Sequence, residues 1–237
     1  MSKNSFMEKI GKKAKVASQD LLKLDINKKN SVLKQFAQYL KINQRSILNA
    51  NKKDLSIAKS KKIKKSMIDR LELNSKKILQ IRNSIEKIVK FKDPTNKILS
   101  SWKRPNGLII KKTSIPIGVI GIIYESRPNV TSDVSALCFK SGNVVILRGG
   151  SEAFHSNKIL AKLFRKALKK KKCNQNCVQF VQSKKRQHVD YLLSSMENHV
   201  DLIIPRGGKS LIKKVLKKSS VSIIGHYEGL CHVFVDR

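Results

Sequence analysis

Two short segments that combine arginine, paired glycines and a hydroxyl side chain follow apolar runs of this 237-residue sequence. They are Arg148-Gly149-Gly150-Ser151, after the apolar residues 144–147, and Arg206-Gly207-Gly208-Lys209-Ser210, after 202–204. Glycine lets backbone N–H groups approach an anion closely, and arginine and lysine add charged donors. Each segment alone could simply connect a strand to a helix. Together they favour a nucleotide or another phosphorylated ligand.

Two common phosphate-binding motifs are absent from the sequence. The P-loop requires a glycine five positions before its Gly-Lys pair, and Ile203 stands at that position. No Gly-x-Gly-x-x-Gly fingerprint follows a strand, because Gly118 and Gly121 lie inside an apolar run. A dinucleotide would therefore need a different way of docking. Two further polar segments follow apolar runs, at 124–131 and 225–229.

The elements that must position these segments alternate between strands and helices over residues 115–237. Apolar runs predict strands at 118–124, 144–147, 178–181, 202–204, 221–224 and 232–235, and amphipathic stretches predict helices at 131–140, 153–172, 187–196 and 209–218. Continuous apolar strands are typical of a mostly parallel sheet covered on both faces. Because ligands of such sheets bind at the carboxyl ends of the strands, we expect the loops after residues 124, 147 and 205 to converge on one pocket.

The preceding residues 1–92 are predicted to be mostly helical. Apolar side chains recur at helical spacing over 5–24, 31–41 and 47–58, and Asn74 or Ser75 can cap a further helix that ends before Pro94. Residues 93–114 then predict a β-hairpin, because Asn-Gly at 106–107 separates two short extended runs.

The charge of the chain is strongly positive, a formal +35 at pH 7. A basic nucleic-acid-binding protein is therefore one hypothesis. The cations, however, are 41 Lys against only 10 Arg, they are spread over both halves, and aromatic residues are 5%. Nucleic-acid readers favour arginine and aromatic side chains. The excess of lysine over arginine and its even spread therefore favour a solvated surface over a nucleic-acid-binding one. A/T-rich codons would explain the enrichment in lysine.

The four cysteines predict neither a disulfide framework nor a zinc site. Cys138 and Cys231 stand among apolar residues and are expected to be buried, and Cys173 and Cys177 lack a second metal-ligating pair. No apolar run reaches the ~18 residues of a membrane span, and no secretory signal is recognisable. We expect a soluble cytoplasmic protein without a metal.

Several stretches of the sequence resemble the gamma-glutamyl phosphate reductase (glutamate-5-semialdehyde dehydrogenase) family, within the aldehyde dehydrogenase superfamily. They are MIDRL at 67–71, IPIGVIG at 115–121, YESRPNVT at 124–131, ALCFKSGN at 136–143, LRGGSEA at 147–153, IPRGGKSLI at 204–212 and GHYEGLCHV at 225–233. The likeness spans essentially the whole chain. It implies a Rossmann-like cofactor domain without the usual glycine fingerprint, made of residues 1–92 and 115–237. It also implies that the hairpin at 93–114 belongs to an extension that joins subunits.

The resemblance implies that NADPH reduces L-glutamate 5-phosphate to L-glutamate 5-semialdehyde and phosphate in proline biosynthesis. A thiolate attacks the activated carboxyl, phosphate leaves, and hydride from the cofactor reduces the thioester. Homo-oligomers and glutamate 5-kinase are the implied protein partners.

Site residues can also be carried over from the resemblance. Asn129 matches the position of an oxyanion-stabilising amide. Arg148 and Ser151, with Gly149, match the position that binds the cofactor's ribose and phosphate. Gly207 and Gly208 match a turn beside the pyrophosphate.

The family's nucleophilic cysteine is expected beyond Arg237, so the catalytic domain is expected to be absent from this chain. Cys231 matches a non-catalytic cysteine. The chain is thus expected to be a fragment that is inactive alone, and a nonfunctional remnant of the reductase is a further hypothesis beside the nucleic-acid-binding one.

Overall fold

Four parallel strands form the central sheet of the fold, in the order β5-β4-β3-β6. A computed structural model describes residues 5–225 and 235. The strands are β3 (Val119–Tyr124), β4 (Val144–Gly149), β5 (Val178–Phe180) and β6 (Leu202–Arg206). Every residue of β3 and β4 is buried, as continuous apolar runs predict for a sheet covered on both faces. The predicted α/β fold with a parallel sheet is confirmed.

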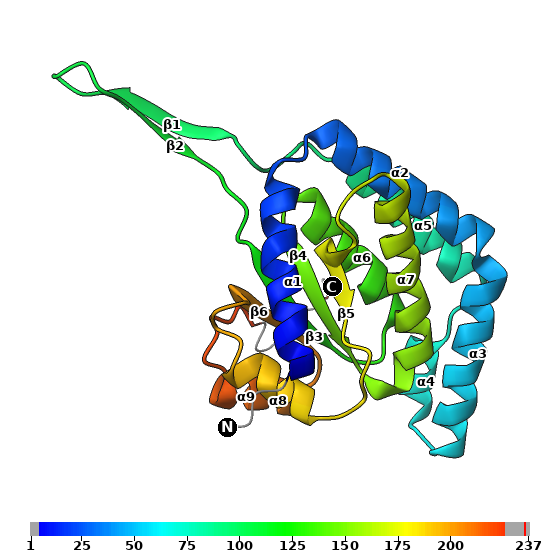
Figure 1. Cartoon of the computed structure of the whole chain (residues 1–237). Helices are drawn as coiled ribbons and strands as arrows, with labels where there is room; N and C mark the ends of the chain where they lie inside the picture. The colour runs from blue at the N-terminus through cyan, green and yellow to red at the C-terminus, as the bar shows by residue number, and fades with distance from the viewer. Residues whose placement is uncertain (1–4, 226–234, 236–237) are drawn as a thin grey trace.

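Helices cover the two faces of this sheet unequally (Figure 1). On one face lie α6 (Pro128–Lys140) and α7 (Phe154–Lys170), with α2 (Ile26–Ile42), α3 (Gln44–Ser60) and α5 (Ser75–Lys90) packed behind them. On the other face lies α1 (Ser5–Leu22), next to α8 (Gln187–Ser194). α9 (Lys209–Lys218) follows β6, and α4 (Lys65–Leu71) follows α3. Two 3₁₀ turns, Ser151–Ala153 and Gln175–Cys177, precede α7 and β5.

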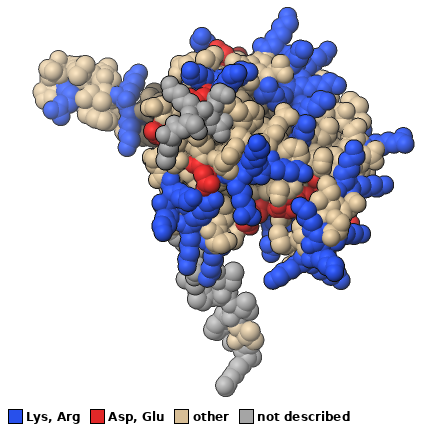
Figure 2. Space-filling view, turned by 60° about the horizontal axis from the view of Figure 1, so that its bottom comes forward, with Lys and Arg blue, Asp and Glu red and all other residues tan. Residues whose placement is uncertain are grey.

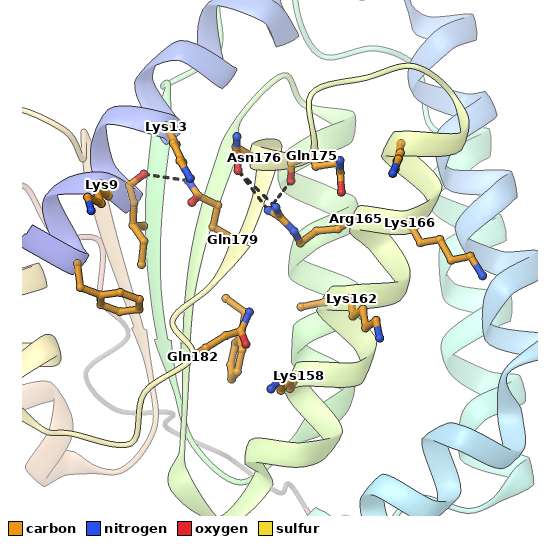
Figure 3. A pocket seen from close by; sticks show the side chains of 15 residues that line it. Lys9, Lys13, Lys158, Lys162, Arg165, Lys166, Gln175, Asn176, Gln179 and Gln182 are labelled. Carbon is orange, nitrogen blue, oxygen red and sulfur yellow. Dashed lines mark hydrogen bonds between the residues drawn. The ribbon is translucent and has the colours of Figure 1, made fainter.

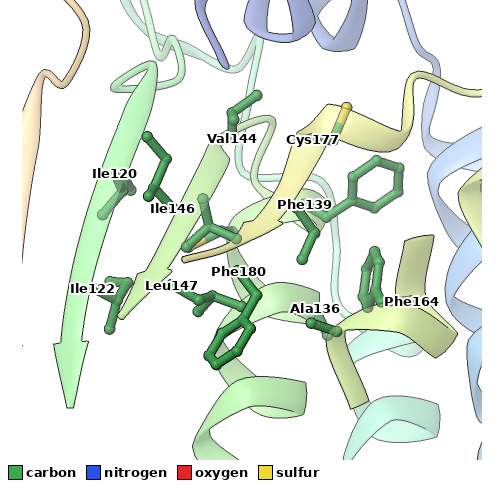
Figure 4. Close-up of a cluster of buried hydrophobic side chains, with 14 of the residues drawn as sticks. Ile120, Ile122, Ala136, Phe139, Val144, Ile146, Leu147, Phe164, Cys177 and Phe180 are labelled. Carbon is green, nitrogen blue, oxygen red and sulfur yellow. The ribbon is translucent and has the colours of Figure 1, made fainter. Parts of the chain in front are cut away.

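The main core lies between the sheet and the layer of α6 and α7 (Figure 4). Ile122 and its neighbour Leu147 on β4 are buried in it, and Phe139 and Phe164 meet edge to face with their centroids 5.8 Å apart. Such a pair adds to the hydrophobic stabilisation of the burial itself. This packing fixes the strands whose ends carry the candidate site.

Several predicted elements differ from those in the structure. α2 begins at Ile26 rather than 31, because the Asp25 side chain accepts a hydrogen bond from the Lys28 N–H and caps the helix earlier. α6 begins at Pro128 rather than 131, since proline at the first helical position needs no N–H partner. Residues 221–224 form one bridge, Ile203 to Ile223, rather than a strand. The predicted strand at 232–235 falls mostly on residues that the structure does not describe. The Asn74 cap on α5 is confirmed, with its side chain accepting from the Lys77 N–H.

The hairpin of β1 (Ile98–Lys103) and β2 (Ile109–Thr113) projects from the body of the molecule (Figure 1). Gly107 adopts a φ of +87° at its tip, a conformation that glycine reaches without strain. Ile98, Leu99, Trp102 and Ile109 are exposed on it. The hairpin itself is confirmed, and its role in joining subunits stays a prediction. Among the described helices, none is long and apolar enough to cross a bilayer.

Candidate functional site

The carboxyl ends of three neighbouring strands stand level with one another. Tyr124 at the end of β3 pairs with Gly149 at the end of β4 and with Arg206 at the end of β6. The loops that follow these strands therefore share one edge of the sheet, as the sequence predicts. Cavities open over this edge.

The first compartment is a cavity of about 490 Å³ over the ends of β3 and β4 and between α8 and α9. Cationic side chains border it from the end of β4, from the loop after β5 and from α9, and Val189 and Leu211 add apolar surface from α8 and α9. Its lining residues are Met67, Ile123, Tyr124, Glu125, Arg148, Gly149, Gly150, Ser151, Glu152, Lys184, Arg186, Val189, Ser210, Leu211 and Lys214.

A second compartment of about 430 Å³ and a third of about 290 Å³ continue this groove. The second is lined by Met67, Arg70, Glu125, Ser126, Arg127, Val130, Pro205, Arg206, Gly207, Gly208 and Ile212. The third is lined by Asp69, Arg70, Glu72, Leu73, Lys77, Gln80, Ile81, Ser84, Arg127, Asn129 and Asp133. The first two compartments share Met67 and Glu125, and the last two share Arg70 and Arg127. The three cavities thus adjoin one another in a row, and together they make up the groove.

A carboxylate stands at the N-terminus of α9, where the sequence suggests a phosphate. Gly208 is the N-cap of α9, and its N–H donates to Glu125 Oε2 at 2.9 Å. A Cβ on Gly207 would lie only 2.6 Å from the carboxyl carbon of Glu125 and 2.8 Å from Leu211. The Glu125 carboxylate therefore occupies the space beside these two glycines. A phosphate that binds at the start of α9 would have to displace it.

A second carboxylate holds the loop after β3. Glu152 Oε1 accepts from the Ser126 N–H at 2.9 Å and from the Ser126 hydroxyl at 2.8 Å. Ser126 has a backbone φ of +30°, a value that residues other than glycine rarely adopt. The paired hydrogen bonds stabilise this conformation and link the loops after β3 and β4.

The Arg148 side chain is buried at the edge of the groove and binds backbone carbonyls instead of extending into solvent. It donates to the carbonyls of Gly149 and Lys184, and only 8% of the residue is exposed. Its Nε is buried and has no hydrogen-bond partner among the described residues. Burial lowers the pKa of the guanidinium, and Glu152 opposes this shift. Arg148 thereby ties the loop after β5 to the end of β4.

The predicted Gly149 and Ser151 also lie at the first compartment, with different surroundings. A Cβ on Gly149 would overlap the Asn157 side chain and lie 3.0 Å from the Tyr124 ring, so the glycine is required by packing. Ser151 is exposed at the start of the 3₁₀ turn before α7. Gly149, Ser151 and Arg148 are therefore brought together, and Gly207 and Gly208 border the adjoining second compartment.

Asn129 lies apart from the other predicted site residues. Because α6 begins at Pro128, Asn129 belongs to its first turn, and its amide donates to Asp133 Oδ2 at 3.1 Å. It lines the third compartment and neither of the other two. The sequence predicts that this amide lies in the loop directly after β3. The structure corrects this placement, because α6 begins earlier than predicted and includes Asn129.

Several groove residues were given no site role from the sequence, although four of them, Met67, Arg70, Glu125 and Glu152, lie in stretches that carry the family resemblance. Lys184 and Arg186 follow β5, a three-residue strand whose loop contains no glycine. Glu125 and Glu152 are acidic, whereas an anion site suggests cations and glycines alone. Met67 and Arg70 come from α4, which is remote from the sheet in sequence.

Arginine is concentrated in the groove while lysine is not. Five of the ten arginines line it, but only three of the 41 lysines do. Figure 2 shows lysine and arginine side chains spread over most of the visible face. Planar guanidinium groups, which donate two parallel hydrogen bonds to a carboxylate or phosphate, are thus gathered at one edge of the sheet.

Another cavity, of about 660 Å³, lies between α1 and α7 (Figure 3). Lys9 and Lys13 face it from α1, and Lys158 and Lys162 face it from α7. None of the described residues that line it is acidic. Its one lining arginine, Arg165, donates to the carbonyls of Gln175 and Val178, so it supports the turn before β5.

Two of the three described cysteines, Cys138 and Cys177, are buried in the core, and Cys173 is partly buried. Burial raises the pKa of the Cys138 and Cys177 thiols to about 12, so both stay protonated near neutral pH. Cys231 lies outside the described residues. Within the described range, no group of three His, Cys, Asp or Glu side chains is placed to hold a metal ion.

A parallel sheet with helices on both faces and a cationic groove at its carboxyl edge defines this chain as an α/β protein of the Rossmann-like type. The chain belongs to the aldehyde dehydrogenase family, whose model matches residues 2–226.

Curated relatives that are 41–46% identical to this chain share the name gamma-glutamyl phosphate reductase. The chain is 46% identical over 231 residues to a gamma-glutamyl phosphate reductase of Nitratiruptor sp., covering 98% of this chain and 56% of that protein. A crystal structure of gamma-glutamyl phosphate reductase from Thermotoga maritima matches with a TM-score of 0.89 and 37% identity, covering 92% of this chain and 52% of that one. The Saccharomyces cerevisiae enzyme matches with a TM-score of 0.86 and 28% identity, covering 94% and 56%. The chain spans about half the length of the curated relatives it matches.

Proposed function

We propose that this chain supplies the cofactor-binding part of an NADPH-dependent reductase in proline biosynthesis. The reaction is the reduction of L-glutamate 5-phosphate to L-glutamate 5-semialdehyde, with release of phosphate. The observation that carries the proposal is the cationic groove at the strand ends, in a chain 46% identical to a gamma-glutamyl phosphate reductase over 98% of its length.

The residues of the first compartment fit the adenosine end of NADP(H). Val189 and Leu211 offer apolar surface to a flat base, and Lys184 and Arg186 lie where a ribose phosphate needs cations. Its volume of about 490 Å³ falls in the ordinary range for ligand pockets. Arg148, Gly149 and Ser151 border the ribose side in this proposal.

The residues of the second compartment fit the phosphate-rich middle and the nicotinamide end. Gly207 and Gly208, at the start of α9, lie beside the pyrophosphate once Glu125 moves away. The cofactor would supply a hydride there. Arg206 places a guanidinium group at this compartment, suited to the phosphate of an acyl phosphate.

Further parts of the proposal follow from the same assignment. The exposed apolar residues of the hairpin would join subunits. Glutamate 5-kinase is the proposed partner, because an acyl phosphate hydrolyses in water and is best handed over where it is made. Both enzymes would then work in the cytoplasm.

Titration of the 237-residue chain with NADPH and with NADH tests the cofactor assignment. Arg186→Gln should weaken NADPH binding more than NADH binding, because only NADPH carries the ribose phosphate. Lys185→Gln is the matched control, since it removes an adjacent exposed cation that does not line the groove. Equal losses for both cofactors, or no NADPH binding by the unaltered chain, would refute the assignment.

The reaction is tested by NADPH oxidation with enzymatically generated glutamyl phosphate. The chain is assayed alone and mixed with the C-terminal half of a relative. Turnover in the mixture supports the reductase, and its absence there counts against it.

A further inference from the structure

Acidic side chains gather in the third compartment of a chain that has few of them. Three of its sixteen acidic residues, Asp69, Glu72 and Asp133, line this cavity of about 290 Å³. The same cavity is bordered by two arginines, Arg70 and Arg127. A ligand that carries one cation and one anion close together matches this mixed lining better than a simple anion does.

Asp133 is the most enclosed of these carboxyl groups. Its Oδ2 accepts from the neutral amide of Asn129 at 3.1 Å, and its Oδ1 is buried with no hydrogen-bond partner among the described residues. Burial raises the pKa of the carboxyl, and the Asn129 hydrogen bond opposes this rise. No cation pairs with it in the described part of the chain, so a cationic group in the compartment would offset its desolvation.

The cations of the compartment differ in availability. The Lys77 ammonium donates to the carbonyls of Asp69 at 3.0 Å and Glu72 at 2.7 Å, so it braces the turn between α4 and α5. The guanidinium groups of Arg70 and Arg127, in contrast, have no ion-pair partner within the described residues, and both are exposed. Two free guanidiniums therefore stand in the same cavity as one unpaired carboxylate.

Arg70 and Arg127 also line the second compartment, so the two cavities adjoin at these exposed side chains. A ligand whose charged head lies in the third compartment can extend its other end toward the start of α9. The cavity of about 290 Å³ is at the lower end of the range for small-molecule sites, as suits the head of an amino acid.

We propose that the third compartment binds the α-amino acid end of the substrate, with its ammonium at Asp133 and its carboxylate at Arg127 and Arg70. Asn129 is a positioning residue that orients the Asp133 carboxylate through their hydrogen bond. The naming of this amino acid as glutamyl rests on the proposed function. The observation that the compartment carries both acidic and basic side chains does not depend on the proposed function.

Binding of three small probes to the 237-residue chain tests the inference, measured by NMR titration. L-glutamate carries both head groups, glutarate lacks the ammonium, and 4-aminobutyrate lacks the α-carboxylate. L-glutamate should bind at least tenfold more tightly than either of the others. Equal binding of glutarate and L-glutamate overturns the inference. It is also overturned if no L-glutamate binds at 50 mM, which is roughly the weakest affinity that can be assigned to a site.

Variants locate the binding groups. Asp133→Asn should weaken L-glutamate at least tenfold and leave glutarate unchanged, whereas Arg127→Gln should weaken both. Glu86→Gln is the matched control, because it removes the same charge from α5 outside the groove. An Asp133→Asn variant that binds L-glutamate within twofold of the unaltered chain would also overturn the inference.

A pH profile separates positioning by Asn129 from a merely structural role. Asn129→Ala removes a hydrogen bond that lowers the pKa of Asp133, so the acid limb of L-glutamate binding should shift to higher pH. An unshifted limb would remove Asn129 from the assignment. NADPH titration of each variant reports on the fold and on the first compartment, so failure here is distinguishable from failure of the cofactor assignment.

Discussion

Glu125→Gln is expected to strengthen NADPH binding. Glu125 accepts the Gly208 N–H at the start of α9, at 2.9 Å, so in the absence of ligand it occupies the position proposed for the pyrophosphate. Glutamine keeps the shape of the side chain and removes its charge. The variant should therefore release this backbone donor more readily.

The size of the effect follows from two contributions. A charge-assisted hydrogen bond is about twice as strong as a neutral one, so its weakening lowers the cost of displacement by roughly 1 kcal/mol. Removing a unit charge about 4 Å from a bound phosphate contributes up to about 1 kcal/mol more in water. Together they amount to roughly 1–2 kcal/mol, or about 5- to 30-fold in affinity.

The assay is a fluorescence titration of NADPH at low and at physiological salt. Glu197→Gln is the matched control, because it makes the same change in net charge outside the groove. The control should change affinity less than twofold at physiological salt. Weaker NADPH binding by Glu125→Gln would refute the reasoning, since Glu125 would then itself contribute to holding the cofactor.

Four other outcomes are expected. Gly149→Ala should lower the free energy of unfolding in urea by about 1–3 kcal/mol, because its Cβ meets packed side chains, whereas Gly208→Ala, with its nearest atom 3.9 Å away, should cost less than ~1 kcal/mol; equal losses would contradict this. Hydrogen bonds from Tyr191 and then His199 lower the pKa of Glu8, so the stability it adds at neutral pH should be lost as pH falls below 4.5. Glu8→Gln should flatten that acid limb in pH-dependent unfolding, and an unchanged limb would exclude this contribution. Trp102→Lys should shift sedimentation toward smaller species if the hairpin joins subunits, and an unaltered profile would rule the hairpin out. DNA and RNA should bind without sequence preference and dissociate at ~0.2 M salt, and salt-resistant binding would instead favour a nucleic-acid function.

The parallel sheet and the shared edge formed by the carboxyl ends of its strands were predictable because periodicity and apolar continuity are local signals. The runs at β3 and β4 are buried throughout, and the level ends of β3, β4 and β6 follow from parallel pairing. The hairpin followed from its Asn-Gly turn, and the α5 cap from Asn74. In each case the deciding interaction lies within a few residues in sequence.

The contents of the groove were less predictable, because they depend on contacts between distant residues. Glu125 meets Gly208 across 83 positions, and no pattern in either segment announces that pair. Asn129 was placed in a loop because the helix start at Pro128 was missed, and its partner Asp133 lies one turn further along α6. A desolvated carboxylate cannot be identified until the packing around it is known.

α4 borders all three compartments although it has only seven residues. Met67 reaches the first and second, Arg70 the second and third, and the helix end is pinned where buried Asn51 binds the Leu71 carbonyl and the Leu73 N–H. A displacement of this helix about its Asn51 anchor would change the width of the whole groove at once. Occupancy of one compartment would then alter affinity in the others, and by linkage the influence would be equal in both directions.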